Sequence, residues 1–467
     1  MDIRAYERAR LARDPRFDGR FFIGVTTTGI YCRPICPAPS PKPQNVRYFP
    51  SAAAAAEAGF RPCLRCRPEA SPGTPAWLGT SATVSRALKL IGESALDDAG
   101  VEALAVRLGI GSRHLRRLFL KYLGATPVAV AQTRRVHFAK KLIDETNLPM
   151  TQVAMASGFS SIRRFNATFQ GLYARTPSAL RKASAKGSDV GEAGRYRFHL
   201  GYRPPYDWDS LIEFLGRRAI PGVESVTPGE YRRTIFMDGK AGAIAVRHVP
   251  GKRSLELQIE YPDPAPLFRI VERVRRIFDL GADPGDVTRQ LIKDDRLRPL
   301  LRAHPGLRVP GCWDGFEMAV RAILGQQVSV KGASTMTGRV ASAYGTVLED
   351  SVLFPPANVL AEADLTAVGV TRQRARSIRE LAAAVAEGEI GFDGALDPPQ
   401  LEERMTRISG IGPWTAQYLA MRLGEPDAFP ADDLYLRDLA GHSGAWRPWR
   451  AYAAMYVWTG IQNGETR

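Results

Sequence analysis

The sequence predicts a multidomain protein with a small α+β domain around a cysteine cluster, an all-α domain, and an α+β domain that continues into a second helical domain. The chain has 467 residues, and domains usually hold about 100 to 200 residues. Residues 183–196 are small and polar without hydrophobic periodicity, which is typical of a linker. The charge balance changes there too, because residues 1–187 carry 29 basic and 12 acidic side chains, whereas residues 188–467 carry 35 and 36.

Local composition sets the expected domain boundaries. A proline-rich stretch closes the first segment, and an internal repeat marks the second. After the linker, short runs such as residues 232–236, 241–246 and 254–259 favour antiparallel strands, and the periodicity then becomes helical. The expected domains are 1–76, 80–182, 197–305 and 306–467, with the linker at 183–196.

Composition also excludes some classes of protein. The chain has no apolar run near the ~20 residues that a membrane helix needs, and its amino terminus lacks the apolar core of a signal peptide. We therefore expect a cytoplasmic protein without a membrane partner. The basic excess of the first 187 residues predicts a polyanionic partner. A membrane surface is the competing partner, but the basic residues form no polybasic run beside an anchor.

Four of the five cysteines form a C-x3-C pair, Cys32 and Cys36, and a C-x2-C pair, Cys63 and Cys66. In an intracellular chain this clustering predicts a metal site before disulfides. Four thiolates suit tetrahedral Zn²⁺. A zinc ion that only holds a small domain together is the alternative interpretation.

The residues around the cysteines carry a resemblance to a known family. TTTGIYCRPICP at residues 26–37 and AGFRPCLRC at residues 58–66 resemble the amino-terminal domain of the Ada adaptive-response family, over about residues 3–75. The resemblance implies that Cys32 accepts a methyl group from a methyl phosphotriester in DNA. A zinc-bound sulfur remains a nucleophilic thiolate. Alkylation removes one negative charge from the site, so we expect affinity for DNA to rise.

The second segment contains two copies of one helical unit. LAVRLGIGS at residues 104–112 is matched by VAMASGFSS at residues 153–161. Each copy has the pattern of a helix-turn-helix, with a glycine in the turn. A helical bundle with a solvated basic face is the alternative. The expected recognition helices carry arginines that can contact guanine edges and phosphates, namely Arg113, Arg116, Arg117, Arg163 and Arg164.

GFSS at residues 158–161 and RTPS at residues 175–178 resemble the AraC-type transcription regulators. The resemblance covers about residues 82–182. It implies a regulator that binds double-stranded DNA and works with RNA polymerase.

ISGIGPWTA at residues 408–416 looks like a helix-hairpin-helix. Gly410 and Gly412 let the backbone approach a phosphate, and the helix that follows aims amide groups at it. A plain turn between helices is the alternative. Similar hairpins bind a monovalent cation through backbone carbonyls, and these map to Thr406, Ile408 and Ile411.

Two adjacent carboxylates follow the hairpin in FPADDL at residues 429–434. A hairpin followed by an aspartate at this spacing resembles the base-excision DNA glycosylases, and the motif position implies that Asp433 is the catalytic carboxylate. We expect Asp432 to cap the next helix, since acidic residues stabilise helix starts.

Further motifs resemble the family of 3-methyladenine DNA glycosylase II, over about residues 197–462. They are RPPYDW at 203–208, PGCWD at 310–314, RAILGQQVSV at 321–330 and WRPWR at 446–450. The resemblance implies an aromatic base pocket and a wedge residue, Gln327, that enters the base stack after flipping. The implied pocket residues are Phe214, Trp414, Tyr418 and Trp458.

An electron-rich pocket suits a cationic alkylated purine. Such a base leaves readily, so Asp433 would stabilise the sugar cation and orient water. Trp414 stands where related lyases place a lysine, and strand cleavage is therefore not expected. The one remaining cysteine, Cys312, cannot complete an iron–sulfur ligand set.

Together the resemblances imply a zinc methyl sensor, a transcription regulator and a monofunctional DNA glycosylase for alkylated bases in one chain. The motif of the O6-alkylguanine methyltransferases, Pro-Cys-His-Arg, is absent from the sequence. One alternative is a transcription regulator whose rear half binds DNA without catalysis. Another is a glycosylase whose zinc domain only targets DNA.

Overall fold

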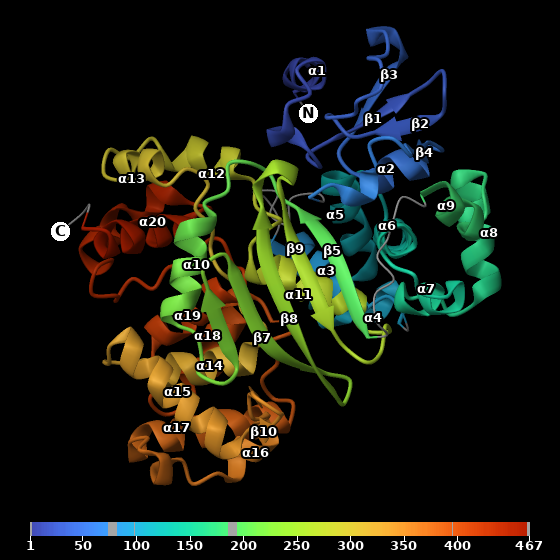
Figure 1. Cartoon of the computed structure of the whole chain (residues 1–467). Coiled ribbons are helices and arrows are strands. Elements are labelled where there is room, and N and C mark those ends of the chain that lie inside the picture. Colours follow the sequence, from blue (N-terminus) through green and yellow to red (C-terminus); the bar gives the residue numbers. More distant parts are fainter. Residues whose placement is uncertain (1, 73–81, 98, 185–193, 395, 465–467) are drawn as a thin grey trace. The chain divides into compact units, whose positions relative to one another are not determined.

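The computed structural model describes residues 2–72, 82–97, 99–184, 194–394 and 396–464 (Figure 1). Residue contacts divide the chain into two compact units. No helix among the described residues is long and apolar enough to cross a membrane. Unit 1 holds Met1–Pro204, Val249–Glu272 and Leu280–Ala282, and unit 2 holds Pro205–His248, Arg273–Asp279 and Asp283–Arg467.

Unit 1 begins with a small α+β fold. Its sheet has the order β3-β1-β2-β4, in which β1 pairs antiparallel with β2 and β3, and β2 pairs parallel with β4. Gly24 of β1 must be a glycine, because a Cβ there would lie 2.7 Å from the Phe49 ring. The elements are α1 (Ile3–Leu11), β1 (Phe22–Val25), β2 (Ile30–Cys32), β3 (Val46–Phe49), α2 (Ala52–Glu57) and β4 (Arg61–Pro62).

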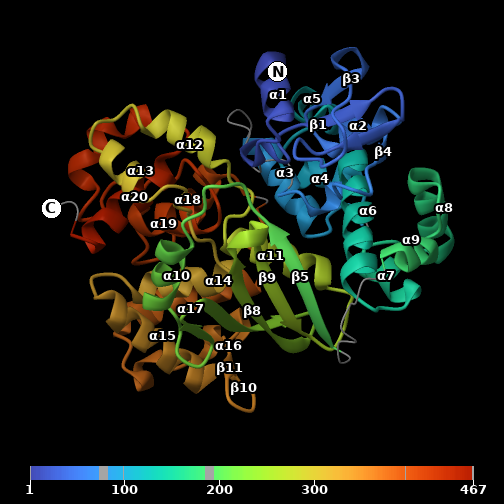
Figure 2. The same cartoon turned by 45° about the horizontal axis from the view of Figure 1, so that its top comes forward.

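The next part of unit 1 is helical and contains the repeated unit. One copy is α4 and α5, the other is α7 and α8, and the long helix α6 connects them (Figure 2). Gly109 and Gly158 have φ of +71° and +75° in the two turns, where a side chain would be strained. The helices are α3 (Ala82–Gly92), α4 (Val101–Arg107), α5 (Ser112–Leu123), α6 (Pro127–Glu145), α7 (Met150–Ala156), α8 (Ile162–Tyr173) and α9 (Pro177–Ser184).

The α+β fold and the first helical copy share one hydrophobic core. Its buried members include Phe22 and Tyr31 from the sheet and Leu115 from α5. The Tyr31 hydroxyl lies 2.9 Å from Nε2 of His137 on α6, and burial lowers the pKa of His137 to about 4, which keeps the ring neutral at pH 7. Unfolding the sheet would therefore expose apolar surface on the helices as well.

Unit 1 also contains the paired strands β5 (Arg195–Gly201) and β9 (Ser254–Glu260), which are antiparallel along their whole length. Phe138 of α6 packs on Phe198 of β5, with ring centroids 6.2 Å apart. The predicted linker 183–196 falls mainly outside the described residues. The domain ranges expected from the sequence stay predictions.

Unit 2 begins with helix α10 and an antiparallel meander of β6, β7 and β8. Strands β7, β8 and β9 contain the short runs that the sequence predicts as strands. The elements are α10 (Trp208–Arg217), β6 (Glu224–Thr227), β7 (Glu230–Met237), β8 (Lys240–Val249), α11 (Leu267–Ile277, which crosses the division between the units), α12 (Pro284–Leu291) and α13 (Arg298–Ala303).

The rest of unit 2 is helical and packs around α14, which contacts α15, α17 and α19. The side chain of Asp314 caps α14 by accepting from the amide of Glu317 at 2.9 Å. The elements are α14 (Gly315–Leu324), α15 (Val330–Tyr344), β10 (Thr346–Val347), β11 (Val352–Leu353), α16 (Ala357–Glu362), α17 (Arg372–Ala386), α18 (Pro398–Thr406), α19 (Pro413–Arg422) and α20 (Arg450–Gln462).

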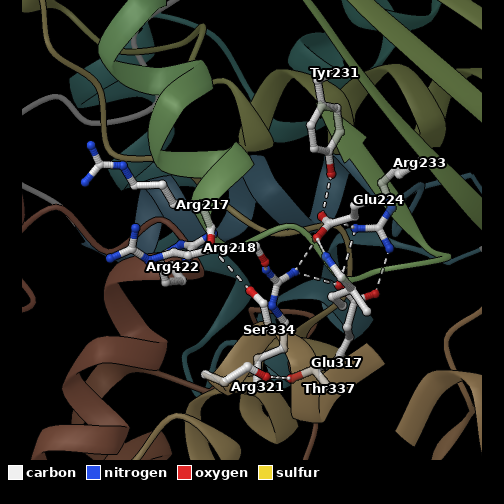
Figure 3. Close-up of polar contacts among 12 residues, drawn as sticks. Arg217, Arg218, Glu224, Tyr231, Arg233, Glu317, Arg321, Ser334, Thr337 and Arg422 are labelled. Carbon is white, nitrogen blue, oxygen red and sulfur yellow. Dashed lines mark hydrogen bonds and ion pairs between the residues drawn. The ribbon is translucent and has the colours of Figure 1, made fainter. Parts of the chain in front are cut away.

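A buried ion network ties α14 to the meander of unit 2 (Figure 3). Arg233 lies 2.7 Å from Glu317, and Arg321 lies 2.9 Å from Glu224. Arg321 also donates to the backbone carbonyl of Arg218, just after α10. Each buried charge has a partner of opposite sign, which offsets the cost of removing it from water. The network holds the end of α10 against α14.

Asp279 of unit 2 gives a prediction about stability and pH. Its carboxylate accepts from the Tyr452 hydroxyl at 2.7 Å, and burial raises its pKa to about 6. Between about pH 4 and pH 6 the unfolded chain loses this proton while the folded chain keeps it, so the free energy of unfolding falls as pH rises, by about 3 kcal/mol at most. Asp279→Asn should remove this fall.

Urea unfolding of both proteins at several pH values would measure this difference. Tryptophan fluorescence is a suitable readout because six of the seven tryptophans lie in unit 2. The difference between the wild type and Asp279→Asn isolates one carboxyl group from the others. Equal pH dependence of the two proteins would show that Asp279 ionises normally in the folded state.

Candidate functional site

The four clustered cysteines come together in unit 1. Their sulfurs all lie within 4.8 Å of one another, and none forms a disulfide. Parallel pairing of β2 with β4 brings Cys32 close to Cys63 and Cys66. The backbone amide of Arg33 lies 3.3 Å from the Cys66 sulfur and donates to it, as expected for a thiolate ligand. The donor set and its compactness fit tetrahedral Zn²⁺.

The four sulfurs have different surroundings. Cys63 and Cys66 are buried, while Cys32 and Cys36 are partly exposed. A cavity of about 580 Å³, which we call the sensor cavity, is lined by Cys32, Cys36 and Cys63 but not by Cys66. Five arginines also line it, namely Arg10, Arg33, Arg61, Arg65 and Arg175. The cavity therefore places sulfur nucleophiles beside cationic groups that can hold a phosphate.

Distant parts of unit 1 build the sensor cavity and support the cysteines. Arg10 comes from α1 and Arg175 from the turn after α8, so sequence spacing alone could not have placed either beside Cys32. Directly after the last cysteine, Arg67 forms ion pairs with Glu69 at 3.3 Å and with Asp144 of α6 at 2.8 Å. The residue after the second pair of cysteines is thus ion-paired to α6, the helix that joins the two helix-turn-helix copies.

Removing zinc should unfold more than the cysteine segment. A four-thiolate zinc site contributes on the order of 10 kcal/mol to folding, comparable with the whole stability of a domain. The core that contains Tyr31 also contains Leu115, so we expect a chelator under reducing conditions to expose the amides of α5. Hydrogen exchange would measure this, with α14 of unit 2 as the internal control. Unchanged protection in α5 would show that its stability does not depend on the metal.

The arginines predicted to contact DNA lie on α5 and α8 and are all exposed. Arg116 forms an exposed ion pair with Glu102 of α4 at 3.0 Å. Arg117 lies 2.9 Å from Nδ1 of His114. Exposure on the second helix of each copy is the placement that recognition requires.

The predicted hairpin lies between α18 and α19 of unit 2. Gly410 has a φ of +83°, and a Cβ there would lie 2.7 Å from the Ser377 hydroxyl oxygen, so a glycine is needed. A Cβ at Gly412 would meet open space, which leaves room for a close ligand. The carbonyl of Ile408 accepts from the amide of Ile411 at 3.1 Å. It is one of the three carbonyls expected to bind a cation.

Two indole groups hold the Asp433 carboxylate. Trp458 donates from Nε1 at 3.0 Å and Trp414 from Nε1 at 3.3 Å, one to each carboxylate oxygen. The backbone amide of Tyr435 also donates, at 3.1 Å. The expectation that Asp432 caps the next helix is wrong, because the helix that follows, η6 (Arg437–Trp446), has Leu436 at its N-cap and no side-chain capping bond. Asp432 is exposed, and its carboxylate has no partner within the described part of the chain.

The four expected pocket residues also come together, and we call them the aromatic cluster. Trp414 and Tyr418 stack at 5.4 Å with an interplanar angle of 5°, and Tyr418 meets Trp458 edge to face at 6.2 Å. Phe214 of α10 is linked to Tyr418 through Arg422, whose guanidinium lies 5.3 Å from the Phe214 ring and 5.8 Å from the Tyr418 ring. Helices α10, α19 and α20 thus supply one site.

Two arginines that contact the aromatic cluster were not identified from the sequence. Arg218 lies 3.7 Å from the Phe214 ring, and Arg422 donates to the Tyr418 hydroxyl at 3.0 Å. Burial opposes ionisation of Tyr418, but Arg422 and Arg218 outweigh it and lower the pKa of the phenol. Each arginine follows its aromatic partner by four residues, one helical turn. That spacing could have identified them.

Comparisons with known proteins agree with this order of domains. Four family models match the chain: the metal binding domain of Ada at residues 5–69, a helix-turn-helix domain at 104–183, the AlkA N-terminal domain at 197–314, and the HhH-GPD superfamily base excision DNA repair protein at 320–456. The predicted fold classes are confirmed, and the four cysteines form a zinc site.

Individual relatives extend the comparison. The chain is 34% identical to DNA-3-methyladenine glycosylase 2 of Escherichia coli, a match that covers 56% of this chain and 96% of that protein. A 3-methyladenine DNA-glycosylase structure from Archaeoglobus fulgidus shares the fold, with a TM-score of 0.50 and 21% identity over 57% of this chain and 98% of that one.

A third relative matches the chain from end to end. It is described as a probable bifunctional transcriptional activator/DNA repair enzyme AlkA of Mycobacterium tuberculosis. The two are 41% identical, and the match covers 99% of this chain and 97% of that protein. The chain therefore belongs to the family of bifunctional transcriptional activator/DNA repair AlkA proteins.

Proposed function

We propose that this protein excises alkylated bases from double-stranded DNA as a monofunctional glycosylase, and accepts methyl groups from DNA methyl phosphotriesters at its zinc site. Through its helix-turn-helix region it regulates transcription. The observation that carries the excision proposal is the Asp433 carboxylate held by Trp414 and Trp458 at the aromatic cluster. The relative from Escherichia coli is named as a glycosylase for 3-methyladenine, and that base is the substrate we propose.

The excision mechanism starts with a flipped, cationic base. The N-glycosidic bond breaks, its electron pair goes to the base, and the base leaves as a neutral purine. Asp433 faces the sugar cation that develops, and its negative charge lowers the barrier. Water then adds to the sugar carbon and passes a proton to the carboxylate or to solvent. The indole donors of Trp414 and Trp458 keep the carboxylate oriented throughout.

The methyl transfer uses the sensor cavity. Zinc, when bound, keeps the cysteine sulfurs as thiolates at neutral pH. The Cys32 sulfur attacks the methyl carbon of the phosphotriester, the carbon–oxygen bond breaks, and its electrons remain on the phosphate oxygen. The products are a thioether at Cys32 and an ordinary phosphodiester. Arg61 and Arg65, which line the cavity, would hold the phosphate oxygens during the transfer.

Regulation follows from the change in charge. Methylation removes one negative charge from the zinc site, so repulsion of DNA phosphates falls and affinity should rise. The exposed arginines of α5 and α8 would then contact the DNA bases, and RNA polymerase is the protein partner expected of such a regulator.

The carbonyls of Thr406, Ile408 and Ile411 are the proposed site for a monovalent cation at the hairpin.

One experiment separates this proposal from its alternatives. Purified protein is incubated with methylated DNA, and both released bases and methylated peptides are measured. Release of 3-methyladenine together with one methylated cysteine supports the full proposal. A regulator with a non-catalytic rear half would release no base. A glycosylase whose zinc segment only targets DNA would release the base but gain no methyl group.

A further inference from the structure

The turn that joins α14 to α15, residues 325–329, has a strained backbone, and we call it the wedge turn. Gln327 is exposed and has a φ of +53°, in the left-handed region that a residue with a side chain rarely adopts. Such a conformation persists only where neighbouring groups enforce it. The contacts of the preceding residue, Gln326, show what enforces it here.

Two atoms of Gln326 make three hydrogen bonds to other parts of the fold. Its side-chain amide Nε2 donates to the carbonyl of Gly410 at 2.9 Å and to the Thr415 hydroxyl at 3.1 Å. Its backbone carbonyl accepts from the guanidinium of Arg374. Because φ of Gln327 describes rotation about the bond next to that peptide group, a fixed Gln326 carbonyl fixes one side of the strained torsion. Gln326 therefore joins the wedge turn directly to the hairpin.

Helix α17 supports the hairpin from the same face that supports the wedge turn. The Ser377 hydroxyl donates to the carbonyl of Ser409, and the Glu380 carboxylate accepts from the amide of Ser409 at 3.1 Å. Arg374, Ser377 and Glu380 are spaced by three residues and share one side of the helix. The wedge turn, the hairpin and α17 are thus mutually bonded, with Gln326 as the direct link between the first two.

We propose that Gln326 is a positioning residue that couples the grip of the hairpin on the DNA backbone to the insertion of Gln327 into the base stack. The inference rests on the proposed base excision and deepens it. A wedge can unstack a base pair only if it is braced against a backbone that is held in place. Gln326 connects the wedge turn to the hairpin, so its loss should impair base flipping and leave the chemistry at Asp433 intact.

The test compares two DNA substrates under single-turnover conditions. One carries 7-methylguanine paired with cytosine, and the other carries it opposite an abasic-site analogue, where less energy is needed to flip the base. Gln326→Leu removes the amide donors and nearly preserves volume. We expect excision from the paired substrate to fall about tenfold, since loss of one or two hydrogen bonds is involved, and excision from the unpaired substrate to change less than about twofold.

The controls separate positioning from a general loss of structure. Gln400→Leu removes an exposed glutamine that caps α18, and it should leave both rates unchanged. Arg374→Met should show the same selective loss of excision from paired DNA, and Arg374→Lys should retain part of that rate. The double variant Arg374→Met with Gln326→Leu should be little slower than either single variant. Equal loss on both substrates, or no loss on paired DNA, would overturn the proposal.

A failure of the excision proposal itself would look different. If the wild type released no base from either substrate, the coupling could still be measured with 2-aminopurine placed next to the lesion. Fluorescence that falls in Gln326→Leu at unchanged DNA affinity would support the coupling. Fluorescence equal to that of the wild type would contradict it.

Discussion

Asp433→Asn is expected to bind alkylated DNA almost normally and to release 3-methyladenine at least ~100-fold more slowly, the range seen when a group that stabilises developing charge is removed. The amide has nearly the size of the carboxylate but no charge to face the sugar cation. It also cannot accept from both indoles, because its NH₂ group would meet the N–H of Trp414 or Trp458. Single-turnover excision measures the chemical step, and circular dichroism checks folding.

Asp432→Asn is the matched control for Asp433→Asn. Its carboxylate is exposed and unpartnered within the described residues, so we expect excision close to that of the wild type. Trp458→Phe removes one indole donor but keeps the charge of Asp433, and an intermediate loss would separate orientation from charge. A larger chemical defect in Asp432→Asn than in Asp433→Asn would mean that the other carboxylate is catalytic.

Cys32→Ala should abolish methyl uptake from phosphotriester DNA and leave base excision unchanged. The sulfur of Cys32 lines the sensor cavity in unit 1, whereas Asp433 and the aromatic cluster belong to unit 2. Transfer is a covalent event at one atom, so the expected loss is complete. Mass spectrometry of the protein after incubation with methylated DNA measures it, and zinc content must be measured in the same samples because a ligand has been removed.

Cys36 is the second candidate for the methyl acceptor, because it is also partly exposed and lines the same cavity. Its methylation must therefore be measured separately from that of Cys32. In the wild type the methyl group should be found on Cys32 alone. The two cysteines share one tryptic peptide because Arg33 and Lys42 each precede a proline, so fragment ions between them must locate the modification. A methyl group on Cys36, or undiminished uptake by Cys32→Ala, would overturn the assignment.

Spacing along the chain was enough to predict several features of the fold. The two cysteine pairs predicted one four-sulfur site, because each pair can meet a single metal from a tight turn. The repeat of LAVRLGIGS at VAMASGFSS predicted two equal helical units, and the structure has them as α4–α5 and α7–α8. The hairpin around Gly410 lies between two helices as expected. Within each cysteine pair, each helical unit and the hairpin, the residues are close in sequence, so local geometry dominates.

The sequence did not reveal contacts between distant residues. Arg10 and Arg175 meet at the sensor cavity only because the α+β fold and the helical region belong to one unit. Neighbouring carboxylates were also difficult to tell apart, because Asp433 differs from Asp432 in accepting from the indoles of Trp414 and Trp458, which lie on other elements, α19 and α20.

By itself the sequence determined the order of domains, the zinc ligands and the residue types of the aromatic cluster, since each is encoded in a short motif or a local period. Only the tertiary structure decided that Arg422 of α19 lies beside Phe214 of α10, that the zinc segment shares its core with α5, and that Gln326 links the wedge turn to the hairpin. Side chains far apart in sequence can meet in many ways, and only the packing of the whole chain selects one of them.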